Sequence, residues 1–263
     1  MRGRDGECIR REVITGVGRR VFLNRCATLG HMGLEALTEM DYPGRFIILG
    51  KNEKGVTTVV YGITGRSDAS RARRMVYDAQ KQHVLVVPTD AKVNEGDVSL
   101  LIYPAIMHAY QLVVTNGAQT KDIAMQIQAP TSPADVMKRG LESWSFEPDA
   151  PHFTPRINGC MVRSEAGFSI IKRGSDGSRV AEYFTVPLVA GMGKLLATYN
   201  GENVNPLPSF AGAPRDVHIA GTTAKECASE AYGAIKNPAF RVAVAAVQFD
   251  LDRGKRTYIV NAK

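Results

Sequence analysis

The order in which strands and helices are predicted to follow one another constrains the fold of this chain most. Residues 44–51 and 56–64 are rich in strand-forming side chains, and the polar segment 52–55 between them ends in glycine, which is typical of a β-hairpin. Residues 74–78 and 83–88 repeat this pattern. Strands therefore succeed one another without intervening helices, whereas a doubly wound parallel sheet alternates the two. We predict an α+β fold of stacked antiparallel sheets flanked by helices.

Helix signals arrive in blocks among the later strands. Thr120 and Ser132 each precede an apolar pattern with helical spacing, and a threonine caps a predicted helix over residues 224–235. The Gly- and Pro-rich region 191–214 has strand-like sequence on both sides, so we expect a long functional loop there rather than a linker between domains. The further predicted strands are 97–103, 110–115, 157–163, 168–172, 181–186, 240–251 and 257–260.

The charge balance favours an anionic ligand. The chain has 263 residues, a formal net charge of +7 and a sequence pI near 9.3, and such a charge concentrates anions near the surface. It has no lysine-rich run, only one tryptophan and no base-reading motif, which disfavours nucleic acid as a partner. No apolar stretch approaches the roughly 18 residues that cross a bilayer, and the first residues lack the apolar core of a secretory signal. We expect a cytoplasmic protein with no membrane partner.

The cysteines and histidines are too scattered to predict a metal site. No Cys-x-x-Cys pair occurs, and the five histidines show no paired spacing. We therefore expect reduced thiols, no metal and no cofactor. The cysteines are Cys8, Cys26, Cys160 and Cys227.

The first forty residues differ in composition from the remainder, because they contain many arginines and no lysine. We expect residues 1–40 to form a loose N-terminal extension and residues 41–263 to form a single catalytic domain. One hypothesis places the true start of the protein at Met32 or Met40. The alternative is a short helix over residues 33–40 that packs on the body of the protein.

One loop after a predicted strand is suited to a phosphate group. Arg66 and Arg71 bracket Ser67 and Ser70, so that a short loop presents two guanidinium groups and two hydroxyls. The planar fork of arginine matches phosphate oxygens, and such charge-assisted hydrogen bonds are roughly twice as strong as neutral ones. The alternative interpretation is that Arg71, Arg73 and Arg74 only solvate a loop.

Two further positions have both a structural and a functional interpretation. Asn116-Gly117, between a strand and a helix, is typical of a tight turn whose backbone N–H groups receive an anion or a carbonyl oxygen, and the same dipeptide also forms ordinary turns. Tyr103 lies at the end of its predicted strand, before Pro104. It is either a packed aromatic side chain or a hydrogen-bond donor in a cleft.

Four separated motifs occur together in an order and spacing that resemble the archaeal-type IMP cyclohydrolase family. The resemblance covers about residues 42–250, and the segment 191–210 is similar to the longer bacterial members. The motifs are Tyr42-Pro43-Gly44-Arg45, Thr64-Gly65-Arg66-Ser67 with Ser70-Arg71, Val114-Thr115-Asn116-Gly117 with Thr120 and Asp122, and Phe146-Glu147-Pro148-Asp149 leading to Thr154-Pro155-Arg156-Ile157.

The resemblance implies a fold and a reaction. The fold is a four-layer α-β-β-α sandwich, similar to N-terminal-nucleophile hydrolases but without their self-processed nucleophile. The reaction is the closure of the purine ring, in which 5-formamidoimidazole-4-carboxamide ribonucleotide loses water to give inosine monophosphate (IMP) in purine biosynthesis. We expect no covalent intermediate and a small nucleotide as the partner.

The resemblance also implies roles for individual residues. Tyr103 and an arginine of the pair Arg66 and Arg71 would donate to the formyl oxygen, and the loop before Thr154 would supply the proton acceptor. The expected catalytic residues are Tyr103, Arg71, Arg66, Asn116, His152 and Glu147, and the expected substrate-binding residues are Arg45, Ser67, Ser70, Gly117, Thr120, Thr154 and Arg156.

Two other functions stay open at this point. A noncatalytic purine-nucleotide-binding protein would share the phosphate-gripping arginines and lack a working acid and base. A thiol amidohydrolase acting through Cys160 or another thiol would use a similar fold for different chemistry. Exposed strand edges and a basic surface also permit a homo-oligomer.

Overall fold

The computed structural model describes residues 12–14, 20–22, 33–90, 102–108, 112–127, 131–250 and 254–262. The chain divides into two compact units, Met1–Met32 and Gly33–Lys263. In the first unit, β1 (Glu12–Ile14) and β2 (Arg20–Phe22) form an antiparallel pair. The candidate site lies in the second unit.

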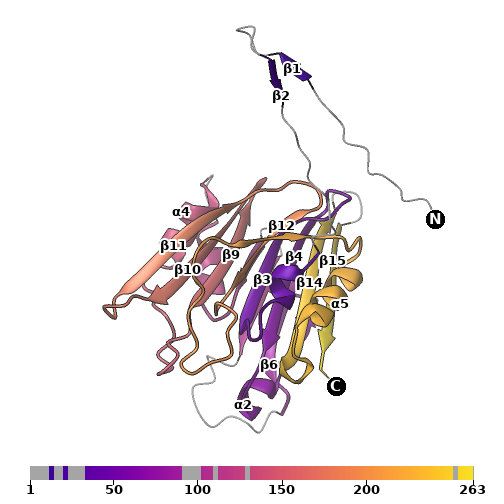
Figure 1. Ribbon diagram of the computed structural model, residues 1–263. Helices are drawn as coiled ribbons and strands as arrows, with labels where there is room; N and C mark the ends of the chain where they lie inside the picture. Colours follow the sequence, from indigo (N-terminus) through magenta and orange to yellow (C-terminus); the bar gives the residue numbers. More distant parts are fainter. Residues whose placement is uncertain are drawn as a thin grey trace, which may run out of the picture. The chain divides into compact units, whose positions relative to one another are not determined.

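Six strands of the second unit form one antiparallel sheet in the order β13-β12-β3-β4-β14-β15 (Figure 1). The predicted hairpin of residues 44–64 is confirmed, because Arg45 to Lys51 pair with Ile63 to Thr57. The strands are β3 (Arg45–Lys51), β4 (Thr57–Thr64), β12 (Met192–Ala197), β13 (Arg215–His218), β14 (Arg241–Asp250) and β15 (Gly254–Asn261).

Seven strands form the other sheet, also antiparallel, in the order β11-β10-β9-β8-β7-β6-β5. Every neighbour in this sheet is also a neighbour in sequence, which is the meander that the succession of strands predicts. The strands are β5 (Arg73–Asp78), β6 (His83–Pro88), β7 (Tyr103–Met107), β8 (Leu112–Thr115), β9 (Arg156–Val162), β10 (Glu165–Arg173) and β11 (Arg179–Val186).

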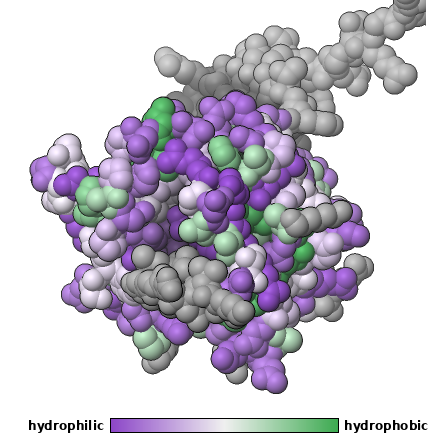
Figure 2. Space-filling view, turned by 90° about the horizontal axis from the view of Figure 1, so that it is seen from below, coloured by the Kyte–Doolittle hydropathy of each residue, from purple (hydrophilic) through white to green (hydrophobic). Residues whose placement is uncertain are grey.

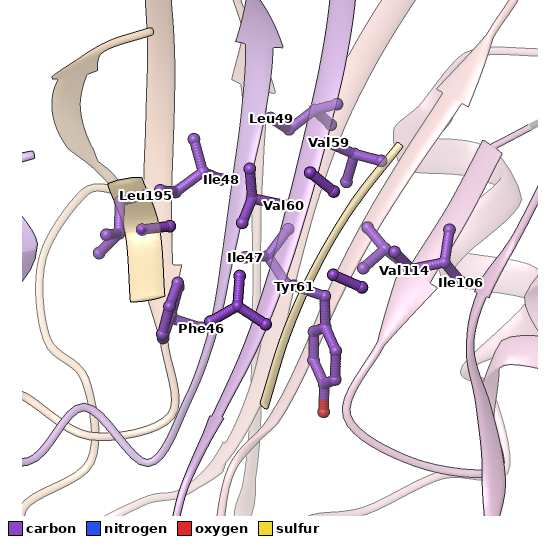
Figure 3. Close-up of a cluster of buried hydrophobic side chains, with 14 of the residues drawn as sticks. Phe46, Ile47, Ile48, Leu49, Val59, Val60, Tyr61, Ile106, Val114 and Leu195 are labelled. Carbon is purple, nitrogen blue, oxygen red and sulfur yellow. The ribbon is translucent and has the colours of Figure 1, made fainter. Parts of the chain in front are cut away.

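The main hydrophobic core joins the two sheets. It contains buried side chains of β3 and β4 together with Ile106 of β7 and Val114 of β8. Figure 3 shows these side chains close together, with the hydroxyl of Tyr61 pointing away from the apolar cluster. Removal of this apolar surface from water is the dominant force that holds the sheets together.

Helices lie beside each sheet. Ile123 of α3 and Val136 of α4 pack with Val113 and Cys160 of the seven-stranded sheet, and α5 packs on β14, β15 and β4. Figure 1 shows α4 beside β9 to β11 and α5 beside β14 and β15. The helices are α1 (Glu35–Thr38), α2 (Asp68–Arg71), α3 (Thr120–Met125), α4 (Pro133–Gly140) and α5 (Ala224–Ala234), with a 3-10 turn at Pro238–Phe240.

Residues 33–40 belong to the second unit and contain the short helix α1. Leu37 is fully buried and Met40 is 1% exposed, and both belong to the main core. This part of the N-terminal segment therefore packs on the body of the protein. Within the described part of the chain, no helix has the length and apolar character needed to cross a membrane.

The prediction of a loop over residues 191–214 is wrong for the first part of that region. The region 191–214 contains β12, which pairs with β3 and with β13. Leu195 and Leu196 are fully buried there. The glycines that suggested a loop instead allow close packing, because a Cβ on Gly50 would lie 2.5 Å from the Cα of Gly193.

Two element boundaries also differ from prediction. Tyr103 begins a strand instead of ending one, while residues 97–101 of the predicted strand lie outside the described residues. Pro104 is tolerated inside this strand because the register of β6 and β7 shifts beside it, and a bulge needs no N–H from proline. The helix cap predicted at Thr120 is Gln119, so that Thr120 is the first residue of α3.

Candidate active site

Arg45 is the first residue of β3. The position before it, Gly44, has no room for a side chain. Gly44 has a φ of +72°, and a Cβ there would lie 2.2 Å from the Oγ1 of Thr198. That oxygen accepts a hydrogen bond from the backbone N–H of Arg45 at 3.1 Å. The Nε atom of Arg45 is buried and has no hydrogen-bond partner among the described residues. The residue as a whole is half-buried, so it is not sealed from a ligand.

Arg73 brings a second guanidinium group towards Arg45 from the other sheet. It is the first residue of β5 and is 4% exposed, and its Nε donates to the carbonyl oxygen of Ser70 at 2.9 Å. Burial lowers the pKa of Arg73, and the positive charge of Arg45 lowers it further. Two like charges held together away from water favour a bound anion.

Arg156 supplies a third guanidinium group. It begins β9, is 6% exposed, and donates its Nε to the carbonyl oxygen of Ser145 at 2.8 Å. Its guanidinium carbon lies 4.7 Å from the centre of the Trp144 ring, a cation–π contact that fixes its plane. Burial lowers the pKa of Arg156, Glu147 opposes that effect and Arg45 adds to it. We call Arg45, Arg73 and Arg156 the arginine cluster.

Glu147 is an acidic residue that faces the arginine cluster, and Asp149 also acts electrostatically on Arg156. Glu147 is 5% exposed, and its Oε1 lies 3.8 Å from a terminal nitrogen of Arg156. Burial raises the pKa of Glu147, and the charges of Arg45 and Arg156 only partly oppose this shift. Burial by itself lowers the pKa of Arg45. Glu147 and the neighbouring tyrosines outweigh this effect, so the pKa of Arg45 is raised. Three guanidinium groups therefore interact with the carboxyl groups of Glu147 and Asp149, and the excess of charge is positive.

Two tyrosines meet beside the arginine cluster. The hydroxyl of Tyr61, from β4, lies 2.8 Å from the hydroxyl of Tyr103, from β7, and both side chains are buried. Burial raises the pKa of Tyr61 well above its usual value. Both hydroxyls interact electrostatically with Arg45, so this pair and the arginine cluster share one region between the sheets.

Thr154 connects the loop before β9 to Tyr199, which follows β12 in the sequence. Its hydroxyl lies 2.6 Å from the hydroxyl of Tyr199, and its backbone N–H donates to Asp149 at 2.6 Å. Burial raises the pKa of Tyr199 to about 12. The ring of Tyr199 stacks on Tyr42 at 5.9 Å. These contacts hold the loop that carries Glu147.

Asn116 is part of a buried hydrogen-bond chain. Its amide nitrogen donates to the carbonyl oxygen of Pro155 at 2.9 Å, and its oxygen accepts from the backbone N–H of Ile157 at 2.9 Å and from Gln119 at 3.2 Å. Gln119 in turn accepts from Arg156 at 3.1 Å. The side chain of Asn116 is therefore occupied by protein partners and acts to orient Arg156.

The Asn-Gly turn is stabilised by hydroxyl groups. The carbonyl oxygen of Gly117 accepts from Thr115 at 2.9 Å and from Thr120 at 2.8 Å. A Cβ on Gly117 would lie 2.7 Å from a terminal nitrogen of Arg156, so glycine leaves room for this guanidinium group. Thr120 and Gly117 thus lie next to the arginine cluster, in a turn that positions Arg156.

The loop with Arg66 and Arg71 borders the site, and neither arginine belongs to the arginine cluster. Arg66 donates to the Asn203 side chain and to the Val204 carbonyl oxygen, each at 3.0 Å, and lies 5.0 Å from the centre of the Tyr42 ring. Arg71 is exposed and pairs with Asp68 at 2.5 Å. Seen from the end of the molecule at which α2 lies, the described surface is predominantly hydrophilic (Figure 2).

Ser67 and Ser70 cap the short helix α2. The Ser67 hydroxyl accepts from the backbone N–H of Ser70 at 3.2 Å, and the Ser70 hydroxyl accepts from the backbone N–H of Ser67 at 3.0 Å. This reciprocal arrangement is a capping box. Both hydroxyls thus have local partners, and the carbonyl oxygen of Ser70 holds Arg73 in the cluster.

His152, which the sequence predicts as a catalytic residue, contacts the segment that follows β12. Its Nδ1 accepts the backbone N–H of Leu207 at 3.1 Å, and its ring lies 6.5 Å from that of Tyr199. The acceptor nitrogen is therefore engaged with the segment after β12. Of Glu147 and His152, Glu147 is the one that faces the arginine cluster.

Sequence reasoning missed Arg73 and Tyr61 as members of the site. Arg73 stands in a run of three nearby arginines that reads as a solvated loop, and Tyr61 stands in an apolar strand. Strand alternation was the available signal, because Arg73 and Met75 point to the buried face while Arg74 is exposed. Inward-facing polar residues at a strand end are unusual without a partner.

The cysteines and possible metal ligands add nothing to this site. Cys160 is fully buried, and burial raises its pKa to about 12, which is opposite to the shift that activates a nucleophilic thiol. Among the described residues, no group of three or more His, Cys, Asp or Glu side chains is arranged to hold a metal ion.

Comparison with known proteins yields one family. The sequence model described as IMP cyclohydrolase-like protein matches residues 42–254, a range that includes every residue of the arginine cluster. A protein from Methanopyrus kandleri named IMP cyclohydrolase is 29% identical over 184 residues, which cover 64% of this chain and 89% of the relative. A protein of the same name from Methanococcus maripaludis (strain C6) is 25% identical over 185 residues, which cover 70% and 84%.

Proposed function

The chain belongs to the IMP cyclohydrolase-like protein family, and on this basis we propose that it catalyses the dehydrative closure of 5-formamidoimidazole-4-carboxamide ribonucleotide to IMP. The relatives that bear the name IMP cyclohydrolase support this assignment. The observation that carries it is the convergence of Arg45, Arg73 and Arg156 between the sheets, beside a carboxyl group and two tyrosines.

The arginine cluster suits a phosphorylated substrate. A guanidinium group binds phosphate oxygens through paired, charge-assisted hydrogen bonds. Arg45 brings a buried Nε–H group without a partner among the described residues, and an unpaired buried donor costs about 1–3 kcal/mol. An anionic ligand removes this cost and the repulsion between Arg45 and Arg73.

Ring closure requires positioning more than covalent help from the protein. The carboxamide nitrogen attacks the formyl carbon of the same molecule, and the two atoms react best when they are held about 3–3.5 Å apart. The new N–C bond forms, and the formyl oxygen leaves as water with one proton from the carboxamide nitrogen and one from the formamido nitrogen. Both groups belong to one substrate, so the proposal requires no covalent intermediate.

The tyrosine pair and Glu147 suit the proton transfers of this reaction. A hydroxyl of Tyr103 can donate to the formyl oxygen as negative charge develops on it, and Tyr61 orients that hydroxyl at 2.8 Å. Glu147 can accept the proton from the carboxamide nitrogen, because a carboxyl group with a raised pKa is a stronger base than an exposed one. Arg66 and Arg71 support the loops around the site in this proposal.

The proposal extends to the architecture and setting of the protein. The packing of α3 and α4 on one sheet and α5 on the other supports a four-layer α-β-β-α arrangement like that of N-terminal-nucleophile hydrolases. Residues 41–263 would carry the catalytic groups of a single domain, and residues 33–40 pack on this domain through Leu37 and Met40. The reaction consumes a soluble nucleotide, which is consistent with a cytoplasmic enzyme that needs no cofactor.

The two other functions have less support. A thiol amidohydrolase needs a reactive thiol, whereas the burial of Cys160 raises its pKa to about 12. A noncatalytic nucleotide-binding protein needs no acid or base, whereas Glu147 and the tyrosine pair lie beside the arginines.

A turnover assay tests the proposal. The purified full chain is mixed with the formamido ribonucleotide without added metal or folate, and IMP is quantified by chromatography. We expect enzyme-dependent conversion of substrate to one equivalent of IMP. Tight binding of the substrate without any IMP would support the nucleotide-binding alternative and refute the proposed reaction. The matched control Tyr77→Phe alters an exposed tyrosine outside the site and should retain full activity.

A further inference from the structure

A cavity lies at the end of the sheets opposite the arginine cluster. It has a volume of about 630 Å³, which lies within the range of small-molecule sites. It is lined by the last residue of β3, the turn between β3 and β4, the turn between β9 and β10, and the start of β15. We call it the basic cavity.

The charges around the basic cavity all have the same sign. Lys51, Lys54, Arg163 and Lys255 line it, and none of the described residues that line it is acidic. In the described part of the chain, no acidic side chain forms an ion pair with Lys51, Lys54 or Arg163. The positive charges of Lys51, Lys54 and Arg163 around one hollow concentrate anions there.

The wall of the basic cavity also has an apolar part. Met161, Leu188 and Phe249 line it, and each is only half-buried. The Nζ of Lys255 lies 5.8 Å from the centre of the Phe249 ring and also donates to the carbonyl oxygen of His108. An aromatic face beside cations is the arrangement on which a nucleobase stacks while its phosphates meet the charges.

Arg163 is held in a backbone conformation that disfavours arginine. It has a φ of +56° in the two-residue turn between β9 and β10, where Val162 pairs with Glu165. Such turns favour Asn or Gly, because a left-handed conformation crowds the Cβ of other residues. Arg163 lines the basic cavity in spite of this conformational cost.

The basic cavity is separate from the arginine cluster. Arg45 begins β3 and Lys51 ends it, and six strand residues span about 20 Å at 3.3 Å per residue. Likewise Arg156 begins β9, and Arg163 follows its last residue. Ligands in the two places therefore do not overlap.

We propose that the basic cavity binds a nucleoside di- or triphosphate, with the phosphates on Lys51, Lys54 and Arg163 and the base against Phe249. The polyphosphate balances the charges, and the base covers the half-buried apolar wall. This site stands independently of the proposed ring closure, because it shares no residue with the arginine cluster.

Isothermal titration calorimetry on the full chain tests this site with GTP, ATP, IMP and inorganic triphosphate in turn. We expect GTP or ATP to bind more tightly than inorganic triphosphate, and binding to weaken as salt is raised. The variant Lys51→Glu/Arg163→Glu should weaken nucleotide binding at least tenfold. The control Arg74→Glu/Lys121→Glu makes the same charge change at exposed residues outside the cavity and should stay within twofold of the wild type. Circular dichroism verifies that each variant folds. If the double glutamate variant does not fold, Lys51→Gln/Arg163→Gln replaces it in the binding experiment.

Several results would overturn the proposal. No binding of either nucleotide is one, and unchanged binding by the Lys51/Arg163 variants is another. Competition by IMP, or loss of GTP binding in Arg45→Met, would place the nucleotide at the arginine cluster instead. Equal affinity for inorganic triphosphate and GTP would remove the role given to Phe249 and with it a nucleoside ligand.

Discussion

The hydroxyls of Tyr61 and Tyr103 lie 2.8 Å apart and join the two sheets at the candidate active site. Tyr61 comes from β4 of the six-stranded sheet and Tyr103 from β7 of the seven-stranded sheet. Arg45 and Arg73 also face each other from different sheets. The site is therefore an interface between sheets, and its geometry depends on how they pack.

The tyrosine pair should couple in a double-mutant cycle. Tyr103→Phe leaves the buried hydroxyl of Tyr61 unpaired, which should cost about 1–3 kcal/mol of unfolding free energy, and Tyr61→Phe should cost a similar amount. The double variant should lose less than the sum, because neither hydroxyl remains. Urea denaturation measures the three values. Additive losses would mean that the two hydroxyls do not depend on each other.

Tyr103→Phe should also slow the reaction. Removal of one donor to a developing oxyanion costs roughly 100-fold in kcat. Steady-state kinetics on Tyr103→Phe and on the exposed control Tyr77→Phe make the comparison. A kcat within threefold of the wild type in Tyr103→Phe would exclude its hydroxyl as the donor.

Arg73 and Arg74 form a matched pair, because they are neighbours on β5 with opposite burial. IMP should raise the thermal midpoint of the wild type, since a ligand at a hundredfold excess over its Kd adds about 2.7 kcal/mol of stability. Arg73→Met should abolish that rise, and Arg74→Met should retain it. Differential scanning fluorimetry with and without IMP gives the result. A full rise in Arg73→Met would remove Arg73 from the nucleotide site.

Glu147 should give the protein a characteristic pH dependence. Its pKa is raised above the usual 4.5 mainly by burial, so the folded state prefers the protonated form. Its contribution to stability is present below pH 4.5 and is lost as the pH rises through the raised pKa. Glu147→Gln should flatten that decline and lower kcat roughly 100-fold or more, as loss of a general base does. An unchanged pH profile of stability would show that Glu147 is ionised without cost.

His108 should produce the opposite slope. Burial, with the nearby charge of Lys255, lowers its pKa from 6.5 to about 4, so the folded state prefers the neutral ring. Its contribution is present above pH 6.5 and is lost as the pH falls towards 4. His108→Phe keeps a ring against Tyr77 and Phe249 and should remove this slope. Chemical denaturation across that pH range provides the measurement, and a slope that persists in the variant would contradict the assignment.

Cys160 should be inert in the folded protein. Its thiol is fully buried, and its pKa is raised to about 12, so little thiolate exists near neutral pH. Iodoacetamide should leave turnover unchanged and should modify Cys160 only after unfolding, as peptide mass spectrometry will show. Loss of turnover in step with alkylation of Cys160 would instead favour thiol chemistry.

The sequence predicts most strands of this fold because their signals are local. Alternating apolar residues and a Gly-terminated turn specify the hairpin of β3 and β4 whatever packs on it. Strand β12 escapes prediction because Gly193 packs closely against Ile219 and against Gly50 of β3, which are tertiary contacts. The same distinction applies to the site: Arg45, Glu147 and Arg156 stand in recognisable motifs, whereas Arg73 and Tyr61 join them only when the sheets stack.

The structure of the full chain in complex with IMP tests the central claim most directly. The account predicts that the nucleotide lies between the two sheets, with an oxygen of IMP within hydrogen-bond distance of the Nε of Arg45 and with Arg73 and Arg156 around it. IMP bound elsewhere, with Arg45 still lacking a partner, would contradict it.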